Sequence, residues 1–333
     1  MTNPSSKPGE FDLIAKFFAP LAADVSGAYG LQDDAATIAL PLGEEFVLTT
    51  DLLSANTHFF AHDPPDLIAR KALRVNLSDL AAKGAKPIGY LLSLALARDV
   101  TTSWIESFAS GLREDQRAFD ISLFGGDTTA TDGPATISIT AFGTLPDGTM
   151  TKRSGAKSGD IVFITGTIGD AAAGLTLLRD RARKDYSEDE KALVERYRLP
   201  RPRIGLGQKL RGIATSALDV SDGLVGDLEH IAETSCVGVI VDADRIPISK
   251  HLRRISNVDQ TSIVTAATGG DDYEIAFTAP ASRRDGIQEL AGQTQTPVTE
   301  IGRVESGKGV ILLNSNGFEI PVAAKGYKHF QFE

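Results

Sequence analysis

The chain has little cysteine, no long apolar run and no excess of positive charge. Its one cysteine, Cys236, excludes an internal disulfide and suits a reducing compartment, so we expect a cytoplasmic protein. Apolar stretches such as residues 88–97 fall well short of the ~20 residues that a membrane-spanning helix needs. Residues 1–8 are polar and lack the apolar core of a signal peptide. These absences predict that the protein has no membrane partner.

Signatures of several binding functions are also missing. The formal net charge is -10 and no basic stripe is present, which argues against a nucleic-acid partner. The glycine-rich P-loop sequence ending in Gly-Lys-Ser or Gly-Lys-Thr is absent, and the five histidines show no zinc-binding spacing. An acidic protein can still bind small phosphates if metal ions lie between the two sets of negative charge.

The composition fits a two-domain enzyme. With 333 residues, 42% of them hydrophobic and 23% charged, the chain can bury a sizeable core. Its patterns predict two α/β halves, 1–148 and 149–333, with the boundary after a Pro-Asp-Gly turn. In the first half we expect helices at 11–21, at 66–85 and from a capping box at Ser103, with strands at 35–40, 46–50, 88–96, 121–124 and 136–142. In the second half we expect strands at 160–165, 217–220, 238–242, 274–278 and 310–314, with helices at 171–178, 189–198 and 224–233.

Aspartates beside Gly, Ser or Thr are the main chemical feature. They lie at 33–34, 51, 79, 127, 219, 222 and 271–272. Carboxylates next to small residues suit hard cations such as Mg²⁺, which prefer oxygen ligands. Each motif alone has a structural alternative. Asp33 and Asp34 fit a turn, Asp79 fits a buried ion pair inside a helix, and the motifs at 125–127 and 219–223 fit a helix cap or a strand end.

Taken in order, these motifs resemble the thiamine-monophosphate kinase family. The resemblance rests on Gly-Glu-Phe-Asp-Leu-Ile at 9–14, Asn-Leu-Ser-Asp-Leu-Ala-Ala at 76–82, Gly-Gly-Asp-Thr-Thr at 125–129, Arg-Ser-Gly-Ala-Lys at 153–157, Asp-Val-Ser-Asp-Gly-Leu at 219–224, Gly-Asp-Asp-Tyr-Glu at 270–274 and Gly-Tyr-Lys-His-Phe at 326–330. Gly-Gly-Asp is shared with the wider superfamily of aminoimidazole ribonucleotide synthetases, selenophosphate synthetases and hydrogenase-maturation proteins. The helix motif at 76–82 and the motif at 326–330 narrow the resemblance to the kinase.

The resemblance implies an α/β (α+β) PurM-like fold of two domains that dimerises through its N-terminal sheets. It implies ATP-dependent, Mg²⁺-dependent phosphorylation of thiamine monophosphate to thiamine diphosphate. The implied Mg²⁺ ligands are Asp34, Thr49, Thr50, Asp51, Asp79, Asp127 and Asp219, with Asp222 as the catalytic residue that holds an ion near the transferred phosphoryl group. The implied ATP contacts are Gly126, Asp127, Arg153 and Ser221, and the implied thiamine monophosphate contacts are His58, Asp271 and Tyr327.

The sequence departs from the family pattern at two positions. Gln32 stands where the family commonly has Gly, which reduces backbone freedom before Asp33, and Asp271 stands where Glu is frequent. Two alternatives remain, namely another ATP-dependent member of the superfamily and a non-catalytic nucleotide- or metal-binding module. The acceptor is a phosphate oxygen that is already ionised, so we expect direct transfer without a dedicated general base.

Overall fold

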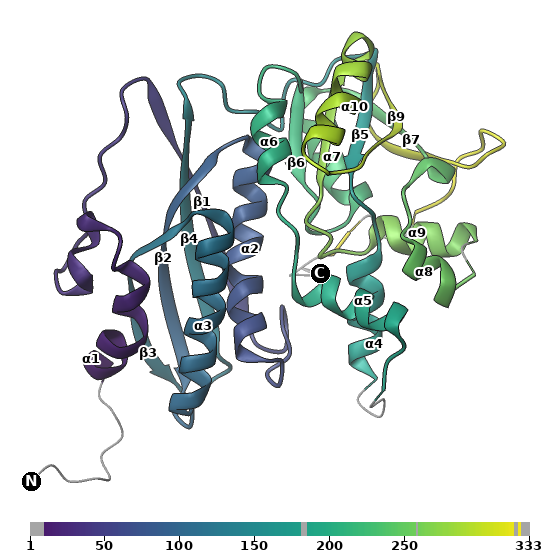
Figure 1. Cartoon of the computed structure of the whole chain (residues 1–333). Coiled ribbons are helices and arrows are strands. Elements are labelled where there is room, and N and C mark those ends of the chain that lie inside the picture. The colour runs from purple at the N-terminus through teal and green to yellow at the C-terminus, as the bar shows by residue number, and fades with distance from the viewer. Residues whose placement is uncertain (1–9, 181–184, 258, 323–325, 328–333) are drawn as a thin grey trace, which may run out of the picture. The chain divides into compact units, whose positions relative to one another are not determined.

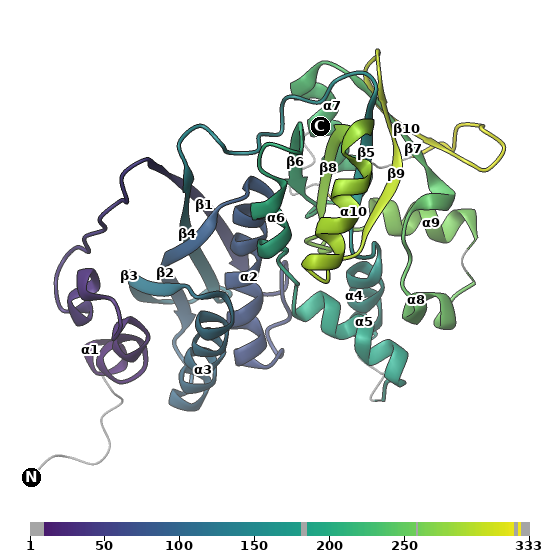
Figure 2. The same cartoon turned by 45° about the horizontal axis from the view of Figure 1, so that its top comes forward.

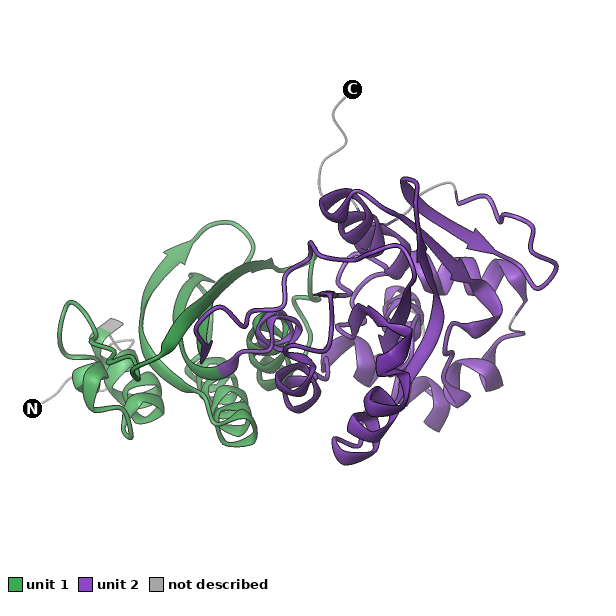
Figure 3. Cartoon of the chain, turned by 90° about the horizontal axis from the view of Figure 1, so that it is seen from above, with its two compact units in different colours: residues 1–76, 87–144 green, residues 77–86, 145–333 purple. Residues whose placement is uncertain are grey.

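The chain folds into two compact units (Figure 3). The computed structural model describes residues 10–180, 185–257, 259–322 and 326–327. Unit 1 consists of Met1–Asn76 and Pro87–Thr144, and unit 2 of Leu77–Lys86 and Leu145–Glu333. The chain passes from unit 1 to unit 2 within one helix, α2 (Pro65–Lys83), and returns before passing into unit 2 again at Leu145.

Unit 1 is built on a four-stranded sheet in the order β1-β4-β2-β3. The strands are β1 (Glu44–Ser54), β2 (Lys86–Ala97), β3 (Ser122–Thr131) and β4 (Thr136–Pro146). One face is covered by α3 (Thr102–Phe119) and the N-terminal part of α2 (Figure 1). A buried carboxylate joins these helices, because Asp115 accepts hydrogen bonds from Arg74 Nε at 2.6 Å and Arg70 Nε at 3.0 Å. This pairing fixes how the two helices lie on the sheet.

The other face of this sheet is apolar and largely open. Side chains alternate along a strand, so residues 46, 48, 50 and 52 of β1 share this face. Leu48 and Leu52 are 67% and 61% exposed, and Leu91 of β2 is 42% exposed. The preceding segment contains α1 (Glu10–Leu13) and the short helical turns η1 (Ile14–Phe18), η2 (Ala19–Ala22) and η3 (Ser26–Leu31). It lines only part of this face.

Unit 2 contains a mixed six-stranded sheet in the order β10-β7-β9-β5-β8-β6 (Figure 2). Its strands are β5 (Asp160–Thr165), β6 (Ser216–Asp219), β7 (Gly238–Asp242), β8 (Ile275–Pro280), β9 (Val298–Glu305) and β10 (Gly309–Leu313). Its helices are α4 (Asp170–Arg179), α5 (Glu188–Arg198), α6 (Ile204–Leu210), α7 (Leu224–Ser235), α8 (Lys250–Ile255), α9 (Gln260–Thr268) and α10 (Arg284–Gln293). Short turns η4 (Ala243–Arg245) and η5 (Ala281–Arg283) complete it.

The sheet of unit 2 separates two cores. Phe163 of β5 packs with residues of α6 and α10 on one face, whereas Val162 and Ile164 pack with α7 and α9 on the other. The last turns of α2 belong to the first of these cores through Ala81 and Ala82. This places Asp79 and Lys83, from the same helix end, in unit 2 near β6.

Most of the expected elements are present, and three expectations were wrong. Residues 35–40 form no strand, and the backbone N–H of Thr37 donates to Gly27 instead. The strand expected at 121–124 does not end before the Gly-Gly-Asp motif, because β3 runs through residues 125–127. The N-cap of helix α3 is Thr101, whose side chain accepts a hydrogen bond from Trp104 N, and Ser103 is not the N-cap. Within the described ranges, no helix is long and apolar enough to cross a membrane.

Candidate functional site

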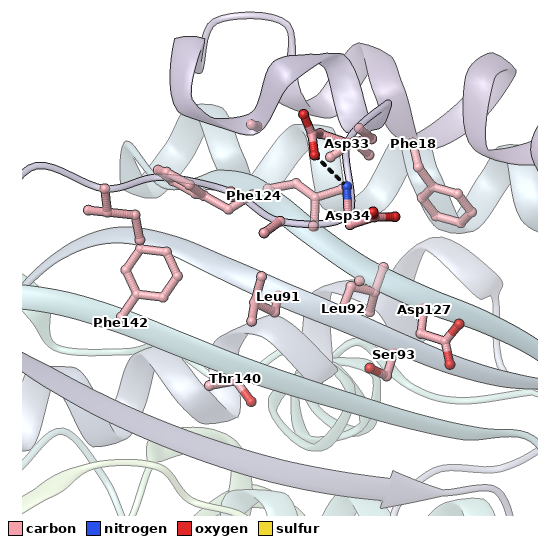
Figure 4. A pocket seen from close by; sticks show the side chains of 18 of the residues that line it. Phe18, Asp33, Asp34, Leu91, Leu92, Ser93, Phe124, Asp127, Thr140 and Phe142 are labelled. Carbon is pink, nitrogen blue, oxygen red and sulfur yellow. Dashed lines mark hydrogen bonds between the residues drawn. The ribbon is translucent and has the colours of Figure 1, made fainter.

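A cavity of about 650 Å³ in unit 1 gathers three of the predicted site residues (Figure 4). Its walls include Phe18, Phe124 and Phe142, while Asp34, Gly126 and Asp127 also line it. Asp34 and Asp127 lie toward the same end of the cavity, away from Phe142 (Figure 4). The backbone N–H of Asp34 donates to Asp33 Oδ1 at 2.8 Å, so the Asp33 carboxylate bonds the next residue of the chain. The cavity therefore has an apolar body and an acidic end.

Gly126 has a structural reason to be glycine. It pairs with Leu92 in the parallel β2–β3 ladder, and a Cβ atom at this position would collide with the Leu92 carbonyl oxygen. At Gly125 the nearest atom to such a Cβ would be Leu91 Cδ2, at 3.4 Å. The close approach of two strands explains Gly126 without any phosphate.

The three predicted ligands in β1 do not share one face. Thr50 lies on the open face, where its hydroxyl donates to Ile139 O at 3.2 Å and lies 3.0 Å from Thr140 Oγ1. Thr140 lines the cavity, so Thr50 lies on the cavity side of the sheet. Thr49 and Asp51 alternate with Thr50 and belong to the opposite, helix-covered face. The three side chains therefore cannot ligate one ion together.

His58 lies in the loop that follows β1. Its Nδ1 accepts a hydrogen bond from Ser54 N at 3.0 Å, and its carbonyl oxygen accepts one from Lys71 Nζ at 3.0 Å. An imidazole whose Nδ1 accepts carries its proton on Nε2. The histidine thus holds its own loop in shape.

Two further predicted ligands form a pair of carboxylates within unit 2. Asp219, at the end of β6, is buried, and burial followed by the negative charge of Asp79 raises its pKa well above the usual value. Lys83, one turn after Asp79 on α2, donates from Nζ to Ala217 O at 2.8 Å. Burial, followed by the charge of Arg153, lowers the Lys83 pKa to about 8, although Asp219 and Asp79 act in the opposite direction. Hence Asp79, Asp219, Lys83 and Arg153 lie within electrostatic reach of one another.

The loop after β6 is organised by a residue that sequence reasoning missed. The backbone N–H groups of Ser221, Asp222 and Gly223 donate to Asp227 Oδ2 at 3.0, 3.1 and 3.1 Å. Burial, followed by the negative charge of Asp222, raises the Asp227 pKa to about 7, while the three N–H groups act in the opposite direction. Asp227 has the spacing of an ordinary polar position on an amphipathic helix, so the sequence did not predict that it accepts hydrogen bonds from the loop amides.

A second loop packs directly against the first. Asp271 N donates to Ser221 O at 2.8 Å, Tyr273 N donates to Val220 O at 2.7 Å, and Tyr327 N donates to Asp222 O at 3.0 Å. These bonds bring together Ser221, Asp222, Asp271 and Tyr327, which the family resemblance assigns to ATP, to catalysis and to the acceptor. Residues 328–330 of the family motif lie outside the described residues.

The second loop has a buried anchor. Asp271 and Tyr273 have φ values of 70° and 51°, an uncommon backbone region for residues other than glycine. The residues that alternate with them, Asp272 and Glu274, are fully buried. Asp272 accepts from Gly169 N at 2.9 Å, while Glu274 accepts from Arg203 Nε at 2.7 Å, Thr165 Oγ1 at 2.6 Å and Arg196 at 3.1 Å.

The predicted metal ligands are divided between the units, with Asp34 and Asp127 in unit 1 and Asp79 and Asp219 in unit 2. Among the residues that the structure describes, no group of three acidic, histidine or cysteine side chains could hold a metal ion. The residues nevertheless fit a hard cation. Asp219 and Asp79 are acidic oxygen donors whose mutual repulsion raises the Asp219 pKa, and a divalent cation would relieve that repulsion.

Comparison with known proteins identifies the class. Residues 32–145 match the family "AIR synthase related protein, N-terminal domain", and residues 157–313 match "AIR synthase related protein, C-terminal domain". The chain is thus a two-domain protein of the AIR synthase related, PurM-like fold.

Relatives narrow the class further. Thiamine-monophosphate kinase from Salmonella typhimurium is 39% identical over 97% of this chain and 98% of its own length, and that from Caulobacter vibrioides is 40% identical over 92% and 87%. The crystal structure of thiamine-monophosphate kinase from Stenotrophomonas maltophilia superposes with a TM-score of 0.83 at 39% identity, covering 90% of this chain and 95% of that one. AaThiL, complexed with AMPPCP and TMP, gives a TM-score of 0.78 at 32% identity, covering 98% and 100%. The chain belongs to the thiamine-monophosphate kinase family.

Proposed function

We propose that the protein transfers the γ-phosphoryl group of ATP to thiamine monophosphate, giving thiamine diphosphate and ADP in thiamine diphosphate biosynthesis. The observation that carries the proposal is the packing of the 219–223 loop against the 269–274 loop and Tyr327 in unit 2, which brings the predicted ATP and acceptor residues together. The full-length similarity to thiamine-monophosphate kinases and to AaThiL, complexed with AMPPCP and TMP, supports the same activity.

The cavity of unit 1 supports nucleotide binding. Its acidic end, where Asp34 and Asp127 lie, suits metal-bound phosphates. We assign ATP contacts to Gly126 and Asp127 in unit 1 and to Arg153 and Ser221 in unit 2. Arg153 is exposed, and its guanidinium would donate charge-assisted hydrogen bonds to a phosphate.

Mg²⁺ would be held by the carboxylates. We assign its ligands to Asp34, Asp127 and the β1 residues Thr49, Thr50 and Asp51 in unit 1, and to Asp79, Asp219 and Asp222 in unit 2. When bound, the metal neutralises the polyphosphate so that two anionic substrates can approach. Thr49 and Asp51 lie on the face of the sheet opposite to Thr50. We therefore expect the Thr50 side chain to ligate the ion, and Thr49 and Asp51 to bind it more weakly.

The acceptor end needs orientation more than base catalysis. His58, Asp271 and Tyr327 would orient thiamine monophosphate, whose phosphate oxygen is ionised and attacks directly. Asp222 is assigned to the transferred phosphoryl group. The single cysteine lies outside these loops, at the C-cap of α7, so we expect no covalent intermediate on it.

We also propose a homodimer, formed through the open face of the unit 1 sheet. Leu48, Leu52 and Leu91 form an apolar surface that a second copy of the chain would cover. Light scattering should show a dimer at micromolar concentration, and Leu48→Asp should shift it toward monomer. A wild-type monomer would contradict this assignment.

The activity has a direct test. Purified protein with Mg·ATP should convert thiamine monophosphate to thiamine diphosphate, and free thiamine should be a poor acceptor. Preference for a different phosphorylated acceptor would instead indicate another enzyme of the superfamily, and nucleotide binding without turnover on any acceptor would indicate a non-catalytic module. γ-labelled ATP without acceptor should leave no stable label on the protein.

A further inference from the structure

The loop between β6 and α7 is folded around a carboxylate of its own chain. Three consecutive backbone N–H groups, at 221, 222 and 223, converge on the single oxygen Asp227 Oδ2 at 3.0–3.1 Å. Asp227 lies in the first turn and a half of α7 and is 5% exposed. Gly223 permits the turn, because its φ is 132° and a side chain there would crowd the backbone of Thr268. The loop therefore has the geometry of an anion-binding ring whose anion is built in.

This arrangement differs from an ordinary helix cap. A capping side chain stands before the helix and accepts from N–H groups inside it. Asp227 stands inside α7, which begins at Leu224, and reaches back to N–H groups that precede the helix. Its carboxylate occupies the place that a phosphate takes in loops where successive amides converge.

The carbonyl groups of the same loop are also used. Val220 O, Ser221 O and Asp222 O accept from Tyr273 N, Asp271 N and Tyr327 N. The backbone of residues 221–222 is thus paired on its amide side by Asp227 and on its carbonyl side by residues of the acceptor end. Only the side chains of Ser221 and Asp222 remain to meet the phosphates.

We propose that Asp227 is a positioning residue for phosphoryl transfer, which fills the amide ring of the 221–223 loop in place of a phosphate and thereby sets the direction of the Asp222 side chain. The proposal rests on the function proposed above. The loop contributes to catalysis through side chains, and its amides do not cradle the polyphosphate.

Three variants test this role. Asp227→Ala leaves three inward-facing amides without an acceptor, so the loop should rearrange. Asp227→Asn keeps one amide oxygen of the same shape and should hold the loop in part. Asp160→Ala is a matched control, because Asp160 is also a buried carboxylate of unit 2 that accepts one backbone N–H, from Lys157 at 2.9 Å, and one hydroxyl, from Thr215 at 2.7 Å.

Kinetics and NMR give independent readouts. Asp227→Ala should lower kcat about 100-fold, as expected when a reacting group is misplaced by about 1 Å, with KM for ATP changed only a few-fold. Asp227→Asn should fall between it and wild type, and formate should partly restore Asp227→Ala. In ¹H–¹⁵N spectra the amide signals of residues 221–223 should move upfield in Asp227→Ala and stay in place in Asp160→Ala, which should keep its kcat.

The outcomes separate the two proposals. If the wild type does not phosphorylate thiamine monophosphate, the function fails, while the amide shifts still report whether Asp227 shapes the loop. If the wild type is active and Asp227→Ala keeps its kcat, the positioning role is wrong. An equal loss of kcat in Asp160→Ala would also overturn it, because the effect would then be general destabilisation.

Discussion

Replacing Gly126 by alanine distinguishes two reasons for the Gly-Gly-Asp motif. The family resemblance assigns Gly126 to ATP, whereas the structure gives it a packing role against the Leu92 carbonyl in the β2–β3 ladder. If packing decides, Gly126→Ala destabilises unit 1 with no nucleotide present. Gly125→Ala is the matched control, because its new methyl group would meet only the end of the Leu91 side chain, at 3.4 Å.

The expected cost follows from the contacts. Overpacking costs about 1–3 kcal/mol, and each ladder hydrogen bond that the strands lose as they separate costs about 1 kcal/mol. The lower entropy of the unfolded alanine chain offsets about 0.5–1 kcal/mol of this. Gly126→Ala should therefore lose about 2 kcal/mol, and Gly125→Ala should stay within about 0.5 kcal/mol of wild type.

The single tryptophan provides the assay. Trp104 lies in α3 of unit 1 and stacks on Phe108 with ring centroids 5.1 Å apart, so its fluorescence reports this unit alone. Urea unfolding of the ligand-free protein, followed at Trp104, gives the two stability differences. If both variants unfold at the wild-type urea concentration and only Gly126→Ala loses ATP affinity, the packing argument is refuted and the phosphate reason stands.

Three further predictions concern unit 2. Asp79→Asn should cut turnover severely and weaken Mg²⁺ binding, while thermal melts without metal stay at or above wild type because the repulsion with Asp219 is gone; a lower melting temperature would favour the ion-pair alternative. Glu274→Gln should cost about 3 kcal/mol in chemical denaturation, because it leaves the buried Arg196 and the partly buried Arg203 without their carboxylate. Glu300→Gln, which faces two half-exposed arginines, should cost under about 1 kcal/mol, and similar losses would contradict this reasoning. Burial lowers the Lys83 pKa to about 8 in the folded protein, against 10.5 in the unfolded chain, so the unfolded state binds more protons between these two values. The free energy of unfolding should therefore rise from about pH 8 to 10.5, by at most about 3 kcal/mol. Lys83→Met should lose that rise, and an unchanged pH profile would show that Lys83 is not responsible.

The sequence predicted the regular elements well where one pattern dominates. Residues 160–165 and 238–242 are strands with the expected bounds, because short β-rich runs between turn residues have few alternatives. Residues 35–40 have the same local character, yet among the described residues they pair with no strand, and local pattern does not encode a missing partner.

The candidate site divides in the same way. Asp219 and Asp222 could be predicted as site residues because small residues surround them in the 219–224 motif. The bonding of Asp227 and the burial of Glu274, which lies inside the 270–274 motif, were not predicted, because acidic residues on helices or beside strands are usually solvent-exposed. Glu274 bonds Thr165, 109 positions away, which no local pattern encodes. Asp227 bonds amides only 4 to 6 positions away, but only the folded structure shows that the loop turns back toward it.

The Asp227 carboxylate in the 221–223 loop also bears on which step limits the rate of turnover. A loop that is shaped by nucleotide must order itself on each arrival and relax on each departure, and such steps limit turnover in many enzymes. Here the ordering is complete when the chain folds, whichever nucleotide is present. We therefore expect ATP and ADP to meet the same loop conformation, so that the slow step of turnover lies elsewhere in the molecule.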